Sequence, residues 1–249
     1  MGRVLSLLFK RRVSSRLHFT LIDPHKTGPE DAAKVASIAE DSGSDAILVG
    51  GSIGVYEPRL SNVVAAIKAS SGLPVILFPG SIAGLTPKAD AVLFMYLMNS
   101  DETYYITGAQ AQASLVVLEM GLEPIPTAYI IVGYGGDAGY IGKARVIPYE
   151  KKEIVAAYAL AGAMMGARLV YLEAGSGAPR PVPEEAVGLA KSLLAKARLE
   201  TLLVVGGGVR TPDVAEKLAR AGADVLVTGN ITEEDPGRLA SIVDSFKSV

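Results

Sequence analysis

The chain of 249 residues contains no cysteine. This absence excludes disulfide bonds and thiolate chemistry, and it agrees with a cytoplasmic protein, which is the localisation we expect. An excess of one charge is also lacking, because 24 lysines and arginines nearly balance 26 aspartates and glutamates. The resulting net charge of −2 provides no general affinity for nucleic acid, so we expect no nucleic-acid partner.

Long hydrophobic runs are missing as well. No apolar run approaches the roughly 18 residues of a membrane-spanning helix, so stable membrane insertion is not expected. The first apolar stretch, Leu5–Phe9, is too short for a signal-peptide core, and its basic residues 10–12 follow it rather than precede it. Residues 1–6 match only the loose myristoylation pattern. We interpret the N-terminal segment as a short amphipathic element that covers the bottom of the fold.

The composition is typical of a globular protein, with 49% hydrophobic and 20% charged residues, which suffices for a sizeable core. Eight apolar runs rich in β-branched residues recur along the chain. They are continuous rather than alternating, as expected of parallel strands that are buried on both faces. We predict strands at Leu17–Ile22, Ala46–Val49, Val75–Phe78, Ala91–Leu97, Ile125–Val132, Leu169–Leu172, Leu202–Val205 and Val225–Val227.

Amphipathic stretches separate most of these strands, and prolines, capping residues and glycines mark several of their ends. The predicted helices span Asp31–Asp41, Asn62–Ser70, Tyr104–Met120, Lys152–Met165, Glu184–Lys196, Pro212–Ala221 and Asp235–Phe246. Strand and helix alternate eight times without a linker or a low-complexity break. We therefore predict an α/β fold, a closed (β/α)8 TIM barrel in a single domain of residues 1–249, with a doubly wound open sheet as the alternative.

The third unit of this barrel is irregular. Residues 79–88 contain two prolines and two glycines, which leave no room for a full third helix before the fourth strand. We predict that this helix is shortened or missing. The shortening is either neutral or a side opening for a long apolar molecule.

Glycines follow the predicted strands seven and eight, as Gly206–Gly208 and Gly229. In barrels of this kind the active site lies at the carboxyl ends of the strands, and these two loops commonly hold a phosphate. Glycine N–H groups approach phosphate oxygens without a Cβ in the way. A tight turn is the alternative, but a similar loop at Gly175–Gly177 after strand six favours a phosphate site.

Two carboxylates stand at strand ends. Asp23 ends strand one and, with the Ser52 hydroxyl after strand two, matches the sparse protein shell of magnesium; a helix cap or a pair with Lys26 is the alternative. His25 and Lys26 can contact an anion, but His25 is a poor transition-metal candidate because His18 precedes the strand end. Glu173 ends strand six beside the anion loop and is a candidate general base. An ion pair of Glu173 with Arg180 or Lys143 is its alternative.

The segment Gly133–Ala138 resembles a dinucleotide-binding pattern, G-x-G-x-x-A. The match is poor, because Pro148 precedes the next helix and no acidic strand end lies about 20 residues further on, as a ribose contact requires. We interpret Gly133–Pro148 as a long mobile loop over the site, with a role as a lid.

Taken in order, six motifs resemble those of the archaeal geranylgeranylglyceryl phosphate synthases and, more distantly, their bacterial heptaprenylglyceryl phosphate relatives. The motifs are L-I-D-P-H-K at 21–26, V-G-G-S at 49–52, L-F-P-G at 77–80, Y-L-E-A-G-S-G at 171–177, V-G-G-G-V-R at 205–210 and T-G-N at 228–230. The resemblance spans the whole chain. It implies a prenyltransferase that joins the C20 group of geranylgeranyl diphosphate to the sn-3 hydroxyl of sn-glycerol 1-phosphate and releases diphosphate, in archaeal membrane lipid synthesis.

The resemblance also assigns roles, position by position. Asp23 and Ser52 correspond to the magnesium site, and Glu173 to the residue that receives the hydroxyl proton. The glycerol phosphate site corresponds to Tyr171, Leu172, Glu173, Ala174, Gly175, Ser176, Gly177, Gly207, Gly208, Gly229 and Asn230. An apolar trench for the prenyl chain is expected near the third unit, with candidates at Phe78, Phe94, Tyr96, Met98 and Tyr129, for which plain core packing is the alternative. A homo-oligomer is also expected.

Two other functions remain open at this point. One is another phosphate-binding barrel enzyme, such as a sugar-phosphate isomerase or lyase. Such an enzyme needs a second acid or base at a strand end, and none stands out besides Glu173 and Asp23. The other is a non-catalytic binder of a phosphate ligand, which would not need Asp23 or magnesium.

Overall fold

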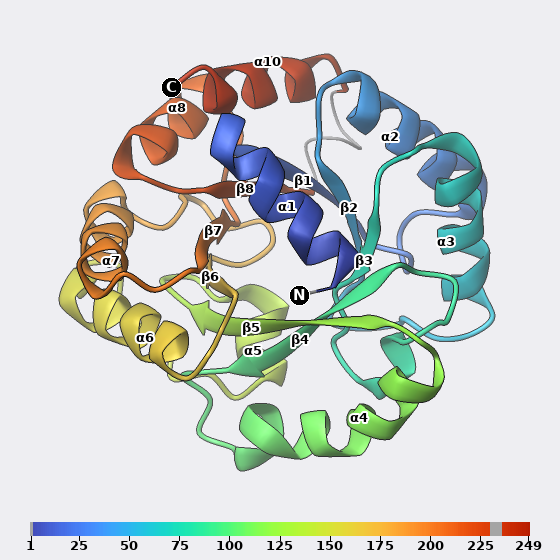
Figure 1. The fold of residues 1–249 in the computed structure, drawn as a ribbon, viewed down its shortest axis with the longest axis horizontal. Coiled ribbons are helices and arrows are strands. Elements are labelled where there is room, and N and C mark those ends of the chain that lie inside the picture. The colour runs from blue at the N-terminus through green and yellow to red at the C-terminus, as the bar shows by residue number, and fades with distance from the viewer. Residues whose placement is uncertain (1, 230–235) are drawn as a thin grey trace.

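The computed structural model describes residues 2–229 and 236–249. Its strands form a closed parallel barrel in which each strand is hydrogen-bonded to the next in chain order (Figure 1). Because β1 also pairs with β8, the predicted TIM barrel is confirmed and the open-sheet alternative is wrong. The strands are β1 (Leu17–Ile22), β2 (Ala46–Val49), β3 (Val75–Leu77), β4 (Ala91–Leu97), β5 (Glu123–Ile131), β6 (Leu169–Glu173), β7 (Leu202–Gly206) and β8 (Val225–Thr228).

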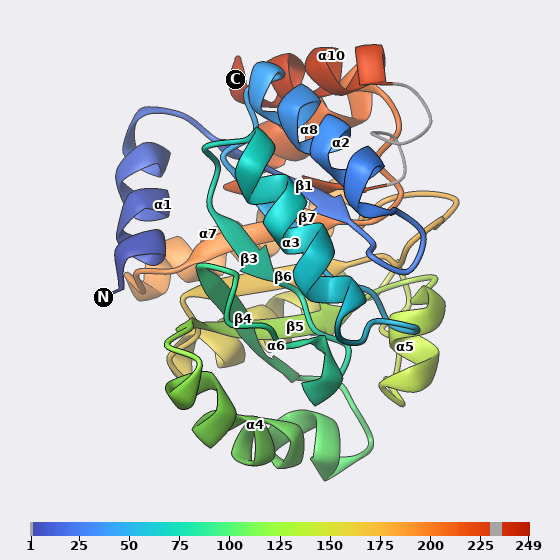
Figure 2. The ribbon, with the colours of Figure 1, turned by 90° about the vertical axis from the view of Figure 1, so that its right-hand side faces the viewer.

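Most of the helices surround the barrel as an outer ring, whereas α1 and α5 lie at its ends (Figure 1 and Figure 2). The helices are α1 (Arg3–Ser14), α2 (Pro29–Asp41), α3 (Arg59–Ser70), α4 (Ala109–Glu119), α5 (Gly136–Ile141), α6 (Lys152–Met164), α7 (Glu184–Ala197), α8 (Pro212–Ala221) and α10 (Pro236–Lys247). Local chemistry sets their ends. At α8, for example, the Thr211 hydroxyl caps the Val214 N–H, Pro212 opens the first turn, and Gly222 ends the helix with a left-handed φ of 104°.

No α-helix lies between β3 and β4. That connection contains only η1 (Ile82–Gly84), a single turn of 3-10 helix, so the missing third helix is confirmed. A second irregular turn, the π-helical η2 (Tyr104–Gly108), precedes α4, where the sequence predicts one continuous helix from Tyr104 to Met120.

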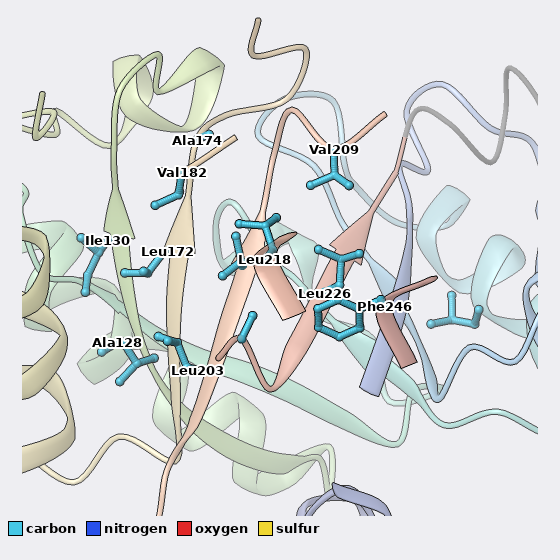
Figure 3. Close-up of a cluster of buried hydrophobic side chains, with 14 of the residues drawn as sticks. Ala128, Ile130, Leu172, Ala174, Val182, Leu203, Val209, Leu218, Leu226 and Phe246 are labelled. Carbon is cyan, nitrogen blue, oxygen red and sulfur yellow. The ribbon is translucent and has the colours of Figure 1, made fainter. Parts of the chain in front are cut away.

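Two layers of apolar side chains flank the strands, which explains the continuous apolar runs. An inner layer fills the barrel and includes Phe19, Leu48 and Tyr171. An outer layer lies between the strands and the helices, and Figure 3 shows part of it, with Leu203 and Leu226 among its members. No helix among residues 2–229 and 236–249 is long and apolar enough to span a membrane.

Helix α1 covers the end of the barrel where the strands begin, as the N-terminal pattern predicts, and lies opposite α5 (Figure 2). Its Val4, Leu5 and Leu8 join the inner layer. A residue far away in the sequence caps its first turn: the Glu123 carboxylate at the start of β5 accepts hydrogen bonds from the N–H groups of Val4 and Leu5 at 2.7 and 2.9 Å. This end of the barrel is therefore sealed.

The segment Gly133–Pro148 departs from its prediction. It contains the short helix α5, and it is joined to neighbouring chain by isolated β-bridges of Ser100 with Ala144 and of Val132 with Ile147. The prediction of a loop without regular structure is therefore wrong. Its predicted place is right, because Asp137 and Ile141 of α5 line the cavity described below.

Candidate active site

One cavity of about 800 Å³ opens at the carboxyl ends of the strands. It brings together, from five separate parts of the chain, most of the residues that the sequence assigns to a site. Those that line it are Asp23, Ser52, Tyr171, Glu173, Ser176, Gly177, Gly207, Gly208 and Gly229. Barrel closure makes this possible, since it sets β1 beside β8 and so places the first and last motifs next to each other.

Among the described residues, three positions predicted for the glycerol phosphate site do not line the cavity: Leu172, Ala174 and Gly175. Leu172 and Ala174 belong to the outer apolar layer, where Figure 3 shows both, so only their backbone can face a ligand. Gly175 acts through its N–H, which donates to Glu173 Oε1 at 2.6 Å. Asn230 lies outside the described residues.

Glu173 is a buried carboxylate, with 6% of its surface exposed. Burial raises its pKa above 4.5, while the Gly175 N–H and the nearby hydroxyls of Tyr171 and Tyr129 act in the opposite direction. Within the described chain Glu173 forms no ion pair. Arg180 lies over the Tyr149 ring and Lys143 over the Tyr140 ring.

The ion-pair alternative for Glu173 is therefore wrong. Its partners are neutral donors, so the carboxylate is a stronger base than one held by a cation. The same contacts bear on Tyr129 and Tyr171, whose pKa values are raised well above 10, first by burial and then by the Glu173 charge. Both phenols are thus neutral around neutral pH.

The glycine loops around Glu173 touch through bare backbone. A Cβ on Gly207, where φ is +82°, would lie 2.5 Å from Glu173 Oε1 and 2.7 Å from the Gly175 N atom. A Cβ on Gly175 would in turn lie 2.7 Å from the Gly135 carbonyl carbon. Only glycine fits these contacts, because real Cβ atoms do not approach so closely. Local packing also accounts for glycines of the Gly133–Ala138 pattern, because a Cβ on Gly133 would overlap the Tyr149 ring and one on Gly135 would crowd Ile131 and Val146.

Asp23 lies on the other side of the cavity. Its Oδ1 accepts the His25 N–H at 2.9 Å, and the carboxylate rests against Gly51, where a Cβ would come within 2.7 Å of Oδ1. Both alternatives fail, since α2 has Gly28 as its N-cap, and the described residues show no ion pair between Asp23 and Lys26. Residues 2–229 and 236–249 contain no cluster of three or more His, Cys, Asp or Glu side chains that could hold a metal ion.

The cavity continues sideways into an apolar part, at the position of the missing third helix. Its lining there comes from η1, β4 and α4, and includes Ile82, Leu85, Leu93, Phe94, Met95, Ala113 and Val117. An apolar extension of the cavity therefore lies where the sequence predicts a side opening. The short connection between β3 and β4 leaves this space, because a full helix at this position would cover the same strands.

The aromatic predictions for the trench are right in part. Phe78, Phe94 and Tyr129 line the cavity. Tyr96 and Met98 do not, because they pack into the outer layer, where the Tyr96 hydroxyl donates to the Gly162 carbonyl at 3.2 Å.

Sequence reasoning missed Tyr105 and Gln110, which also line the cavity. They come from η2 and α4 rather than from a strand end, so a search confined to strand ends does not find them.

The chain is similar to proteins of known activity over its full length. The geranylgeranylglyceryl phosphate synthase of Aeropyrum pernix is 60% identical over 248 residues, which cover 99% of this chain and 97% of the relative. That of Pyrococcus horikoshii is 50% identical over 94% of this chain and 90% of the relative.

Solved structures agree with this. The crystal structure of (S)-3-O-geranylgeranylglyceryl phosphate synthase from Thermoplasma acidophilum in complex with sn-glycerol-1-phosphate matches with a TM-score of 0.94 at 41% identity, covering 100% of both chains. The family model of PcrB matches residues 10–248. The chain belongs to the PcrB family.

Proposed function

We propose that this protein is a magnesium-dependent geranylgeranylglyceryl phosphate synthase. It transfers the C20 group of geranylgeranyl diphosphate to the sn-3 hydroxyl of sn-glycerol 1-phosphate and releases diphosphate. One observation carries the proposal above the others: a single cavity joins a polar floor, with Glu173 and the glycine loops, to an apolar side opening. A small phosphate ligand needs only the floor, whereas a prenyl chain needs the opening.

The acceptor side is formed by the ends of β6, β7 and β8. The backbone N–H groups of the loops at Ser176–Gly177, Gly207–Gly208 and Gly229–Asn230 bind the phosphate of the glycerol phosphate. The buried Tyr171 hydroxyl lies near Glu173 but, within the described part of the chain, makes no hydrogen bond of good geometry, so it can bind the ligand. Glu173 then faces the sn-3 hydroxyl.

The donor side is formed by the ends of β1 and β2. Asp23 and Ser52 would hold a Mg²⁺ ion through two oxygens from the protein, a set too sparse for a structural metal but suited to Mg²⁺ in a phosphate-binding site. An ion held there would supply positive charge to stabilise the departing diphosphate. His25 and Lys26 also line the cavity on this side and contact the diphosphate.

The reaction breaks the bond between C1 of the prenyl chain and the diphosphate oxygen, and the electron pair leaves with diphosphate. The sn-3 hydroxyl oxygen forms the new bond to C1. Its proton passes to the Glu173 carboxylate, whose raised pKa suits it to receive a proton at this point. The apolar wall excludes water, which would otherwise capture C1 and yield the free alcohol.

The decisive experiment incubates purified protein with Mg²⁺, geranylgeranyl diphosphate and sn-glycerol 1-phosphate, and detects the ether product by mass spectrometry. We expect the ether only when all three are present, and a much lower yield with the sn-glycerol 3-phosphate enantiomer. An absence of ether in the complete mixture would refute the proposal.

Magnesium dependence is tested separately. Chelation with EDTA should abolish turnover and added Mg²⁺ should restore it. Asp23→Asn should lower turnover strongly while leaving the unfolding transition in place, because Asp23 is only half-buried and pairs with no cation in the described structure. Wild-type rates in that variant would remove the metal site from Asp23.

We also propose a homo-oligomer. Large apolar side chains are exposed on two helices of the outer ring, with Leu115 and Leu118 of α4 at 69% and 75%, and Met164 of α6 at 65%. Leu115 and Leu118 are three positions apart and so lie on one face of α4, and neighbouring exposed apolar side chains mark an interaction surface. Light scattering after gel filtration measures the mass, and Leu118→Glu should convert an oligomer that uses this surface into a monomer. A wild-type mass equal to that of one chain would contradict the proposal.

A further inference from the structure

Three aromatic rings gather in the middle of the cavity. Phe78 follows β3, Tyr129 lies on β5 and Tyr171 on β6, and all three line the cavity. Phe78 stacks on Tyr171 with 5.6 Å between ring centroids and 21° between planes. Tyr129 meets Phe78 and Tyr171 edge-on, at 5.6 and 5.2 Å. We call Phe78, Tyr129 and Tyr171 the aromatic trio.

The aromatic trio lies between the two polar sides of the cavity. On the donor side, the Phe78 carbonyl is packed against Gly50, where a Cβ would overlap it, and Gly80 is packed against Gly51 and Ser52 in the same way. On the acceptor side, the Tyr171 hydroxyl and Glu173 Oε2 both lie against Gly206, within 2.4 and 3.0 Å of where its Cβ would be.

A prenyl carbon that leaves diphosphate near Ser52 and reaches a hydroxyl near Glu173 must therefore pass along these rings. The deepest rings are closed to solvent, since Tyr129 and Tyr171 are only 7% and 1% exposed, while Phe78 is partly open to the cavity.

The reacting carbon becomes positively charged as it crosses this gap. When the C1–oxygen bond breaks and both electrons leave with diphosphate, C1 and C3 of the allylic group share one positive charge. The faces of aromatic rings carry a negative quadrupole that attracts cations, more strongly where water is excluded. We propose that the aromatic trio stabilises this allylic cation by cation–π interaction, with Phe78 as the ring that contacts it most directly.

The chemistry of the three rings supports this role. Phe78 has no hydroxyl that could capture the cation. The two phenols stand beside the Glu173 carboxylate, and both pKa values are raised well above 10, so they stay protonated and compete poorly with the acceptor hydroxyl as nucleophiles. The alternative is that the three rings serve only to fill the core. Core packing requires apolar volume but not an aromatic ring, so an experiment can distinguish it from cation–π stabilisation.

The test compares a cationic with a neutral ligand. Geranylgeranylamine is an ammonium at neutral pH and carries its charge on the nitrogen bonded to C1, whereas geranylgeraniol has the same chain without charge. Binding of each to the whole protein is measured by calorimetry in the presence of Mg²⁺ and inorganic diphosphate. Phe78→Leu keeps apolar volume and removes the ring, and Phe78→Tyr keeps the ring.

We expect Phe78→Leu to weaken binding of the amine about tenfold and binding of the alcohol less than twofold, since tenfold lies within the range of a desolvated cation–π contact. Phe78→Tyr should restore amine binding. In turnover, Phe78→Leu should lower kcat with little change in the KM for glycerol phosphate. Equal losses for amine and alcohol, or no loss for either, would overturn the proposal.

A second pair of variants covers the case in which Phe78→Leu does not fold. Tyr129→Leu removes a ring of the aromatic trio, and Tyr129→Phe keeps it without the hydroxyl. The same selective loss of amine binding is expected for the leucine variant alone, and equal behaviour of the two variants would also overturn the proposal. This inference rests on the proposed function. Ether formation by the wild type is therefore measured in parallel: its absence would refute the proposed function, whereas its presence without selective loss of amine binding would refute the cation–π role alone.

Discussion

Buried carboxylates at the two ends of the barrel differ in the charge of their partners. At the end where the strands begin, Asp224 receives Arg12 and Lys191 at 2.8 and 2.6 Å and the Leu203 N–H at 2.9 Å. Asp45 has a comparable set, with Lys247 at 2.7 Å and Arg11 at 3.5 Å. At the carboxyl end, Glu173 is as buried, yet within the described residues it meets only neutral donors.

This difference separates stability from chemistry. A carboxylate with two cations and a backbone N–H has its charge fully compensated, so it holds α1 and α7 against the barrel. A cation beside Glu173 would lower its pKa and make it a weaker base. The comparison therefore predicts that changes at the carboxyl end lower activity, and that changes at the other end lower stability.

The largest expected effect is at Glu173. Glu173→Gln keeps the shape and removes the base, so kcat should fall by about 10²–10⁴-fold, the range for loss of general acid–base catalysis. The variant should keep a normal unfolding transition and bind glycerol phosphate with near wild-type affinity by calorimetry. Lost binding with intact turnover would assign Glu173 to recognition instead.

The pH dependence of the wild type sharpens this prediction. Burial raises the pKa of Glu173 above 4.5, and the carboxylate must be unprotonated to accept the hydroxyl proton. The rate should therefore rise as pH rises through that raised pKa and level off above it. The inflection in kcat/KM, which reports the free enzyme, should lie above 4.5, and it is assigned to Glu173 if Glu173→Gln abolishes it.

The next effect is at the opposite end of the barrel. Asp224→Ala leaves two cations and the buried Leu203 N–H without their partner, so the free energy of unfolding should fall by about 3 kcal/mol. Chemical denaturation measures this. The matched control is Asp31→Ala, an acid with 71% of its side chain exposed, which should change stability by less than about 0.5 kcal/mol. A loss of kcat at 25 °C in folded Asp224→Ala would show that this end of the barrel also affects activity, and would contradict the division between stability and catalysis.

A smaller and more selective effect is expected at Gly207. Gly207→Ala combines an unfavourable positive φ with overlap against Glu173 and Gly175, so the KM for glycerol phosphate should rise at least about tenfold, or about 1.4 kcal/mol. Gly121→Ala is the matched control, because Gly121 also has a positive φ, of 66°, but nothing lies within 4 Å of its Cβ.

Both glycine variants should lose about 1–2 kcal/mol of stability from the backbone alone. Only Gly207→Ala should alter the KM. An equal change of KM in both would mean that backbone strain, rather than contact between the loops, sets the geometry of the phosphate site.

The last effect is confined to acidic pH and comes from a residue that connects the two ends. His18 is fully buried in β1, with Nδ1 2.9 Å from the Ser44 hydroxyl and Nε2 2.9 Å from that of Thr228, beside Gly229. Burial, followed by the Lys247 charge, lowers the pKa of His18 from 6.5 to about 3. The folded protein therefore keeps His18 neutral while the unfolded chain takes up a proton below pH 6.5.

This contribution to stability is complete above pH 6.5 and is lost as pH falls toward 3. Between pH 6.5 and 5 the loss from His18 should be about 2 kcal/mol, at 1.36 kcal/mol per pH unit. His18→Asn should be less stable at neutral pH but should show a correspondingly shallower decline over that interval. Parallel stability curves for the variant and the wild type would show that His18 does not carry this dependence.

The sequence by itself determined the barrel, the absence of its third helix and the residues at the strand ends. These features are local: an apolar run, a proline or a glycine acts on its own neighbourhood, so Pro79 and Gly84 interrupt a helix whatever surrounds them. The order of motifs then sufficed to predict the family.

Only the tertiary structure decided which partners these residues meet. Arg12 and Asp224 are 212 positions apart, and closure of the barrel brings them together. The sequence predicts Tyr129 only as a candidate residue of the prenyl trench. The pairing of β5 with β6 places it beside Tyr171 and Glu173. Glu173 has no ion-pair partner among the described residues because its neighbours are neutral, which suits it to the proposed role of base. The neighbours of a buried side chain are set by strand register and packing, which no local pattern contains.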